Sequence, residues 1–467
     1  MSRSTKLASN TLLIGIGTVG SKLLVFLLMP FYTAWLTTAE FGTAELITAT
    51  ANLLIPIACL GITNGIFRFA ADRSANKTEV FSSGVALLGM GLLGFAVLSP
   101  LLLLVKYFSS YYLLILIYVL VANLQSVCAQ YVRAIDDTRL FAVQGILNTA
   151  FTVVFNVLFL AVWDLGLVGY VLSVIVGNVL TVGFLVWRAK LWRVFRPSAV
   201  RRQLIKEMLI FSLPLVPTTV CWLITDLSDR YMVTAICGEA ATGIYSASYK
   251  IPTLVNLASG IFMQAWQLSA VAESSDEEEC SNFYSQVFGG FLSVAFLGSA
   301  FLILFSQLFT GILLNSAYGE AWRYMPTLLC AVAFEAVVSF LATVYMVKKK
   351  STHSFVTAMI GTVLNVALNL LLIPQMGALG AAIATMASYF AVLAVRLIDV
   401  HRLMRFDLHT VRLSVNVILL LGEAAVMTYA EKGRLLFTAL LAAALLAINA
   451  PTLLCSMKRL FLKKWKR

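Results

Sequence analysis

Residues 222–231 read Trp222-Leu-Ile-Thr-Asp226-Leu-Ser-Asp229-Arg230-Tyr231, and they lie inside an apolar stretch that runs over 208–236. A charge at the centre of a bilayer costs about 2.5–3.5 kcal/mol on insertion scales, so such a side chain usually faces water or a partner. Lys22 and Lys250 lie inside two further apolar stretches. These charges are therefore the first candidates for a functional site.

The rest of the chain has the composition of a membrane protein. Its 467 residues are 60% hydrophobic and 12% charged, with a mean hydropathy of +0.90. A membrane-spanning helix needs about 20 apolar residues. Windows of that length give about fourteen candidate spans, namely 9–36, 44–66, 79–105, 111–132, 140–162, 166–187, 208–236, 242–270, 284–310, 324–347, 354–374, 377–397, 411–430 and 434–456. We therefore predict an all-α polytopic membrane protein without a globular domain.

The basic residues predict the orientation. If the N-terminus is cytoplasmic, the inward segments hold 27 of the 34 Lys and Arg residues, the outward segments hold four, and three lie within spans. This bias predicts cytoplasmic N- and C-termini in the cytoplasmic (inner) membrane. The first span is too long for a cleaved signal peptide and carries Lys22 and Pro30, so we expect it to be retained. The formal charge of +12 is thus explained by basic residues in the cytoplasmic segments. We therefore do not interpret it as a nucleic-acid-binding surface, and we expect no nucleic-acid partner.

Several classes of protein do not fit the chain. Its seven cysteines are odd in number and scattered, which fits neither a disulfide framework nor a metal site. The sequence has no HExxH, Walker A or GxSxG pattern, so it offers no ATPase motor and no hydrolase nucleophile. Its predicted outer loops are short and contain no histidine, which argues against a glycan polymerase or ligase. We expect neither an enzyme nor a bound cofactor or metal.

The chain repeats itself. Gly42 near the start of the second predicted span corresponds to Gly243 in the eighth, 201 residues later. Phe155-Asn156-Val-Leu before Gly166-Leu-Val-Gly169 likewise corresponds to Leu368-Asn369-Leu-Leu before Gly377-Ala-Leu-Gly380. A single GxxG between two helices is only a tight connection, but two pairs at similar offsets indicate duplication. The repeat predicts two six-helix lobes related by a pseudo-two-fold axis along the membrane normal, plus two extra C-terminal helices.

The expected domain organisation follows from this repeat. We predict an N-terminal lobe, a basic cytoplasmic linker, a C-terminal lobe, helices 13 and 14, and a basic cytoplasmic tail, over 1–188, 189–207, 208–397, 398–456 and 457–467.

The charged residues inside the predicted spans have two interpretations. In one, Lys22, Arg230 and Lys250 line a central cavity that suits an anionic substrate, and Arg68 lies near its inner mouth. In the other, Asp226 or Asp229 neutralises Arg230 or Lys250 in a structural salt bridge. Lys22 has no carboxylate in its own span and is the cation that we most expect to bind substrate.

Three other acids and two prolines are weaker candidates for functional residues. Glu45, Glu335 and Glu423 are also acids in apolar stretches. Of these, Glu335 is predicted either to be a protonatable coupling site or to form a hydrogen bond between helices. Pro214 and Pro217 predict a bend in the seventh span, as a hinge or as an ordinary kink.

Several motifs together resemble a known family. They are Pro30-Phe-Tyr-Thr33 with Glu40-Phe-Gly42, Asp229-Arg230, Gly243-Ile-Tyr245-Ser-Ala-Ser-Tyr-Lys250, and Ile373-Pro374-Gln-Met-Gly377-Ala-Leu-Gly380-Ala-Ala-Ile-Ala-Thr385. In order and spacing they resemble the Wzx-type oligosaccharide flippases of the multidrug/oligosaccharidyl-lipid/polysaccharide (MOP) exporter superfamily. The chain departs from the pattern of the first loop at Ala34, where a basic residue is usual, and at Thr37-Thr38, where Ser-Pro is usual.

The resemblance implies a function. Members of this family move polyprenyl-diphosphate-linked oligosaccharides to the outer leaflet by alternating access, and basic cavity residues of related flippases hold the diphosphate. Lys22, Arg230 and Lys250 stand at matching positions. The implied partners are the lipid-linked oligosaccharide, membrane lipids, a polysaccharide polymerase and glycosyltransferases. The alternative is a cation-coupled multidrug exporter of the same fold, which would favour an acidic and aromatic cavity.

Overall fold

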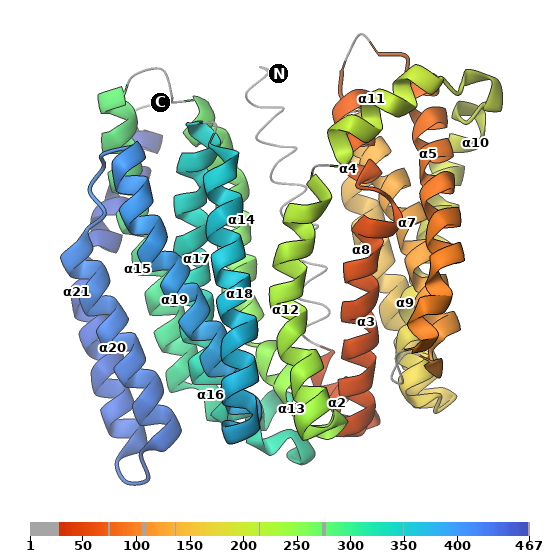
Figure 1. The fold of residues 1–467 in the computed structure, drawn as a ribbon. Coiled ribbons are helices and arrows are strands. Elements are labelled where there is room, and N and C mark those ends of the chain that lie inside the picture. The colour runs from red at the N-terminus through yellow and green to blue at the C-terminus, as the bar shows by residue number, and fades with distance from the viewer. Residues whose placement is uncertain are drawn as a thin grey trace. The chain divides into compact units, whose positions relative to one another are not determined.

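The computed structural model describes residues 28–72, 75–104, 109–135, 137–213, 215–272, 277–348 and 350–465. Every regular element in these ranges is a helix. Eleven of the described helices are long and apolar enough to cross a membrane. The predicted all-α membrane protein is therefore confirmed for this part of the chain, whose course is drawn in Figure 1.

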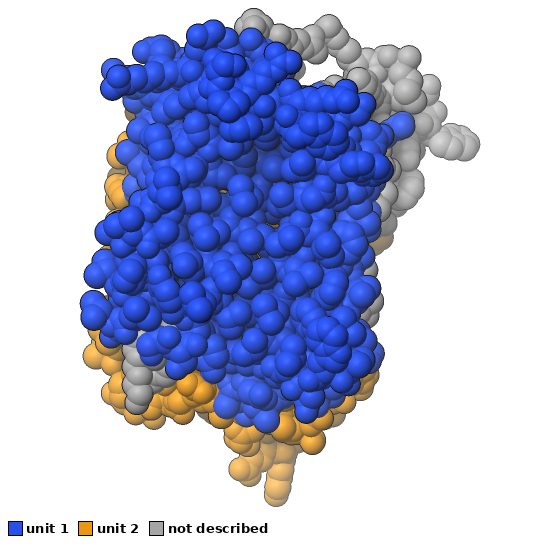
Figure 2. All heavy atoms as spheres, turned by 90° about the vertical axis from the view of Figure 1, so that its right-hand side faces the viewer, with its two compact units in different colours: residues 1–227 blue, residues 228–467 orange. Residues whose placement is uncertain are grey.

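The chain forms two compact units, residues 1–227 and 228–467, which are coloured separately in Figure 2. The first unit contains α2 (Met29–Trp35), α3 (Thr38–Ala58), α4 (Ile62–Ala70), α5 (Lys77–Leu98), η1 (Ser99–Leu104), α7 (Tyr112–Ala134), α8 (Thr138–Asn156), the π-helical η2 (Val157–Val162), α9 (Gly166–Arg188), α10 (Leu191–Val194), η3 (Pro197–Ala199) and α11 (Arg202–Ser212). The boundary between the units falls inside α12 (Leu215–Cys237).

The second unit continues with nine helical elements, namely α13 (Glu239–Tyr249), α14 (Pro252–Ala272), α15 (Glu277–Leu304), α16 (Ser306–Leu313), η4 (Ser316–Arg323), α17 (Met325–Val347), α18 (Ser351–Met376), α19 (Ala378–Leu403) and α20 (Thr410–Tyr429), and with α21 (Arg434–Trp465). Its core lies around α17, whose apolar window is 83% buried. Helices α14, α15, α19 and α20 pack around α17.

Two predicted spans are not continuous helices, so their prediction as single helices was wrong. The stretch 44–66 divides into α3 and α4 at a turn, where Leu60 and Gly61 have φ of +52° and +69°. A left-handed backbone cannot continue a right-handed helix. The stretch 242–270 divides into α13 and α14 beside Pro252, which has no backbone N–H to donate.

The predicted start of the seventh span at residue 208 was also wrong. Met208 and Ser212 belong to α11, whose buried face packs against α4 and α5. The packing is close, because a Cβ on Gly61 would lie 2.8 Å from the backbone oxygen of Ser212, and one on Gly65 would lie 2.5 Å from its Oγ. Helix α11 therefore belongs to the packed end of the first unit.

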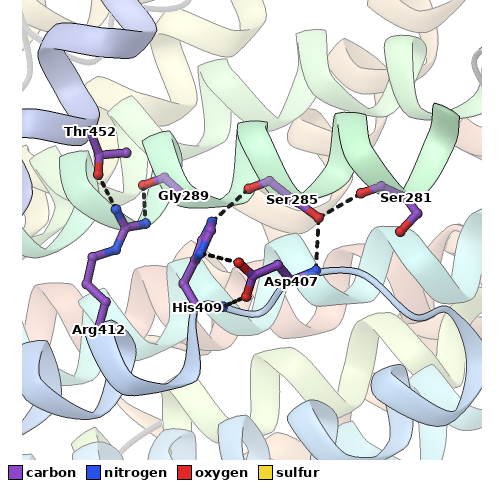
Figure 3. Close-up of polar contacts among 7 residues, drawn as sticks. All are labelled: Ser281, Ser285, Gly289, Asp407, His409, Arg412 and Thr452. Atoms are coloured by element: carbon purple, nitrogen blue, oxygen red, sulfur yellow. Dashed lines mark hydrogen bonds and ion pairs between the residues drawn. The ribbon is translucent and has the colours of Figure 1, made fainter. Parts of the chain in front are cut away.

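Hydrogen bonds connect the hairpin of α20 and α21, and the loop before it, to α15 (Figure 3). The backbone N–H of Asp407 donates to Ser285 Oγ at 2.9 Å, and His409 Nε2 lies 3.1 Å from the Ser285 carbonyl. Arg412 donates to the Gly289 carbonyl at 3.0 Å and also to Thr452 Oγ1 on α21. These contacts join the two last helices to the rest of the second unit.

The connections before α9 and α19 have similar geometry. Gly166 and Gly377 both have positive φ, of 49° and 60°. A Cβ on Gly169 would lie 3.2 Å from the carbonyl oxygen of Phe159, and one on Gly380 would lie 2.5 Å from that of Leu372. In both hairpins the second glycine therefore lets a helix lie directly against the backbone that precedes it.

We predict that Gly380→Ala lowers the apparent melting temperature, because its methyl group would overlap a backbone oxygen that cannot move aside. Overpacking of this kind costs about 1–3 kcal/mol. Gly298→Ala on α15 is the matched control, because nothing lies within 4 Å of its added Cβ. Size-exclusion chromatography of the heated, detergent-purified variants measures the effect. Equal melting temperatures for the two variants would contradict the packing described for Gly380.

Candidate functional site

Asp229 lies at the centre of a buried polar cluster in the second unit. Its side chain is 2% exposed. Its Oδ1 accepts hydrogen bonds from Asn369 Nδ2 at 2.7 Å and from Asn365 Nδ2 at 3.2 Å. Its Oδ2 accepts from Tyr245 Oη at 2.8 Å and from Thr385 Oγ1. All four donors are neutral, and neither Arg230 nor Lys250 is among them.

Four helices supply this cluster. Asp229 comes from α12, Tyr245 from α13, Asn365 and Asn369 from α18, and Thr385 from α19. The two asparagines are four residues apart, so they lie on one face of α18. The close approach at Gly380 joins α18 to α19 and so brings Thr385 to the same place.

A second layer of contacts orients the donors. Ser228 Oγ donates to Asn365 Oδ1 at 2.6 Å, and Asn365 Nδ2 also lies 3.1 Å from Thr385 Oγ1. We refer to Ser228, Asp229, Tyr245, Asn365, Asn369 and Thr385 as the Asp229 cluster. Hydrogen bonds to an ionised acceptor are shorter and roughly twice as strong as neutral ones. The cluster can therefore hold a carboxylate away from water without an ion pair.

The first unit has a comparable buried cluster. Glu45 is 4% exposed, and its Oε1 accepts from Tyr170 Oη at 3.1 Å. Asn156 Nδ2 donates to Tyr32 Oη at 2.9 Å, and Ser173 Oγ donates to Asn156 Oδ1 at 2.8 Å. The rings of Tyr32 and Tyr170 meet edge to face at 5.1 Å. We refer to Tyr32, Glu45, Asn156, Tyr170 and Ser173 as the Glu45 cluster.

The two clusters use corresponding parts of the chain. The Glu45 cluster joins α2, α3, α8 and α9, which lie in the first, second, fifth and sixth predicted spans. The Asp229 cluster joins α12, α13, α18 and α19, which lie in the seventh, eighth, eleventh and twelfth. Asn156 and Asn369 are the asparagines that the sequence repeat placed at matching positions. Each cluster thus contains a buried carboxylate and a tyrosine, together with an asparagine at the position that the repeat predicts to be equivalent.

The predicted cations are placed as follows. Lys22 lies outside the described residues. Arg230 and Lys250 are half-buried, and Arg68 is exposed near the end of α4. Lys250 stands at the break between α13 and α14. Arg230 follows Asp229 directly, so the helix turns it by about 100° away from the Asp229 cluster.

The other predicted residues have less distinctive positions. The side chain of Asp226 on α12 is not described, and Pro214 lies outside the described residues. Pro217 is exposed in the first turn of α12, where proline removes no helical hydrogen bond. Glu335 on α17 is half-buried and accepts a hydrogen bond from Asn256 Nδ2 on α14 at 3.1 Å. In the part of the chain described, no group of three or more His, Cys, Asp and Glu residues could hold a metal ion.

Sequence reasoning did not identify the partners of Asp229 as site residues. Asn365 and Asn369 carried a signal, because two amides one turn apart in an apolar span need hydrogen-bond partners within the bundle. Arg396 lies near the end of the predicted span 377–397 and within α19, but its burial was not predicted: it is 1% exposed. Apolar windows alone set the end of that span too early.

Comparison with protein families gives one match. The profile of the family described as "Polysaccharide biosynthesis protein" matches residues 7–267, more than half of the chain. The chain therefore belongs to this family. No curated protein sequence matches the chain significantly.

Solved structures of the MOP superfamily and of a lipid II flippase have a similar fold. The lipid II flippase MurJ, in an inward closed conformation, covers 98% of this chain and 100% of its own, with a TM-score of 0.69 and 14% identity. A multidrug resistance MATE family transporter of the MOP superfamily, in an inward-facing conformation, covers 83% of this chain and 98% of its own, with a TM-score of 0.67 and 15% identity. A MOP superfamily transporter from Pyrococcus furiosus covers 85% and 95%, with a TM-score of 0.59 and 15% identity.

We predict that Tyr245→Phe destabilises the protein, because it removes a hydrogen bond to a buried carboxylate. Bonds to charged groups contribute about 1.5–3 kcal/mol. Ser246→Ala is the matched control, because the adjacent Ser246 Oγ is buried with no hydrogen-bond partner among the described residues. The apparent melting temperature in detergent should fall for the first variant and stay level or rise for the second. A fall of the same size in both would contradict the assigned role of Tyr245.

Proposed function

We propose that this member of the polysaccharide biosynthesis protein family is a flippase for a polyprenyl-diphosphate-linked oligosaccharide. It moves the substrate across the cytoplasmic membrane for cell-surface polysaccharide synthesis. The observation that carries the proposal is the family match over residues 7–267. The fold supports it, because MurJ, which is named a lipid II flippase, shares that fold over nearly the whole chain.

The chemical task is to carry a sugar head group and a diphosphate through hydrocarbon that offers no hydrogen bonds. We propose that Lys22, Arg68, Arg230 and Lys250 line the water-filled path and hold the anionic head group. Two observations support the roles of Arg230 and Lys250. Both are half-buried, and Lys250 stands where a predicted span is discontinuous. Discontinuous membrane helices are the usual place of substrate sites in transporters.

A cation-coupled multidrug exporter is the second candidate, because a MATE family transporter shares the fold. Organic cations favour exposed acids and aromatic faces. Here the carboxylate of Asp229 is buried and already accepts from four neutral donors, so it does not face a solvated substrate. The remaining charges proposed for the path include four cations. The polarity therefore favours an anionic substrate.

Because the sequence lacks an ATPase motif, transport would be driven by an ion gradient, by the membrane potential or by consumption of the substrate on the far side. Of these, we propose an ion gradient. Asp229 is the proposed coupling residue. Its carboxylate lies among hydroxyl and amide groups, and the nearby Asn369 Oδ1 is buried without a hydrogen-bond partner in the described structure. A proton or a small cation bound there would neutralise the charge and change the contacts among α12, α13, α18 and α19. Asp226 and Glu335 are the alternatives from the sequence.

We also propose that residues 1–188 and 208–397 are the two six-helix lobes of a duplicated transporter with fourteen spans and cytoplasmic termini. The Glu45 and Asp229 clusters support the duplication, because they join equivalent stretches. The similar geometry at Gly166–Gly169 and Gly377–Gly380 supports it as well. In the cell, glycosyltransferases would supply the substrate and a polymerase would consume it.

We predict that Arg230→Gln and Lys250→Gln each reduce export of surface polysaccharide about tenfold or more, because each removes a charged contact to the diphosphate. Lys22→Gln should do the same, and Lys250→Arg should retain export. Lys206→Gln is the control, since Lys206 is exposed on α11. Immunoblots of surface polysaccharide in an exporter-deficient strain, at matched protein levels, measure the effect. Full export by all three neutral variants would refute the cationic path.

We predict that Asp229→Asn keeps the fold but uncouples transport from its ion gradient. An amide occupies the same volume, and the side-chain amides of Asn365 and Asn369 can turn to present oxygens to it. Transport into vesicles with and without sodium or proton gradients measures coupling, with Glu335→Gln as the comparison. Gradient dependence that survives in Asp229→Asn and disappears in Glu335→Gln would assign the coupling role to Glu335.

A further inference from the structure

A groove on the second unit lies between the start of α18 and the end of α19. It encloses about 390 Å³ and is lined by side chains of both helices, namely Thr352, His353, Val356, Thr357, Ile360, Val395, Ile398, Asp399 and Arg402. From Thr352 to Ile360 it follows α18 for roughly 12 Å, at 1.5 Å per residue. None of these residues belongs to the Asp229 cluster or to the proposed substrate path.

One end of the groove is polar. His353 Nδ1 lies 2.9 Å from Asp399 Oδ2, and the hydroxyl of Tyr345 donates to the same oxygen at 2.8 Å. Arg402, one turn beyond Asp399, is exposed and lines the groove. The carboxylate is therefore engaged by the imidazole and the phenol, and the exposed Arg402 lies at the same end of the groove.

A second guanidinium lies beneath the groove. Arg396 is 1% exposed. It donates to Thr357 Oγ1 at 3.0 Å, to the Val338 carbonyl at 2.7 Å and to the Ser354 carbonyl at 3.4 Å. These acceptors are neutral, so they leave its positive charge in place. With a neutral imidazole, Arg396 and Arg402 outweigh Asp399 by one positive charge, and a protonated His353 adds another.

The other end of the groove is apolar and open. Val356, Ile360 and Ile398 are 48%, 40% and 60% exposed. Both helices are long and apolar enough to span a membrane, so these side chains face acyl chains. The polar end lies where α18 begins and α19 ends, close in sequence to the basic residues 348–350 and to Arg405. It therefore lies at the membrane face that carries most of the basic residues.

We propose that this groove binds one anionic glycerophospholipid of that leaflet. The phosphate is held by Arg402 and His353 over the buried charge of Arg396, and an acyl chain lies along Val356, Ile360 and Ile398. Basic pockets between membrane helices commonly bind anionic lipid head groups. A volume of about 390 Å³ is at the small end for ligand sites, which suits a phosphate with part of a chain. The inference does not rest on the proposed flippase function.

Native mass spectrometry of the full-length protein in detergent tests the proposal, with dioleoyl phosphatidylglycerol and dioleoyl phosphatidylcholine as probes. The wild type should bind the anionic lipid more tightly. A basic residue near the membrane surface contributes about 1 kcal/mol, so Arg402→Gln should weaken that binding about fivefold. Arg405→Gln is the matched control, because Arg405 is exposed nearby and does not line the groove. Equal affinity for the two lipids, or equal effects of the two substitutions, would overturn the proposal.

Three further measurements identify the ligand. Ile360→Trp fills the apolar half of the groove and should weaken binding of the anionic lipid. The elution volume of this variant in size-exclusion chromatography should equal that of the wild type, which shows that the protein still folds. Glycerol 3-phosphate should compete poorly, because it lacks the acyl chain. Competition by it at the same concentration as the whole lipid would show a site for free phosphate instead. Undecaprenyl phosphate that displaces the anionic lipid at a tenth of its concentration would assign the groove to a polyprenyl carrier and reject the glycerophospholipid.

Discussion

A buried polar group inside a bilayer has no water to bond, so leaving it without a partner within the protein is costly, and both oxygens of Asp229 have partners. Its two oxygens accept from Tyr245, Asn365, Asn369 and Thr385, which come from three helices besides its own. Satisfying one carboxylate therefore sets how α12, α13, α18 and α19 pack. The glycine at position 380 contributes by allowing α19 to lie against the backbone of α18. A bundle built in this way can respond as a unit when the charge on that carboxylate changes.

The same constraint separates two kinds of charge along α12. Asp229 turns into the packed bundle, and Arg230 is turned about 100° away and stays half-buried. The acid is thus assigned to the inside of the unit, and the cation lies on another face of the same helix. In the proposed function these neighbouring residues serve different tasks, Asp229 in coupling and Arg230 in binding the substrate.

The sequence alone predicted the helical membrane architecture and the family, because these depend on apolar windows and on motifs in a fixed order. It did not predict the break at Leu60 and Gly61, since a left-handed turn inside an apolar run leaves the hydropathy unchanged. Nor did it predict that Arg396 is buried in α19, because its acceptors are two backbone carbonyls and a hydroxyl that only the packing of α17, α18 and α19 brings together. The partners of Asp229 required tertiary structure for the same reason. The spacing of Asn365 and Asn369 was the one local sign of them.

The central claim is that the protein moves a diphosphate-linked glycan lipid from one leaflet to the other. Its most direct test is a vesicle assay with the purified full-length protein and a fluorescent polyprenyl-diphosphate oligosaccharide, in which a membrane-impermeant lectin or quencher detects head groups that reach the opposite face. The account predicts protein-dependent, gradient-stimulated arrival of the head group and no uptake of a quaternary ammonium dye. Dye uptake by the same vesicles, with the glycan lipid remaining in its original leaflet, would contradict it.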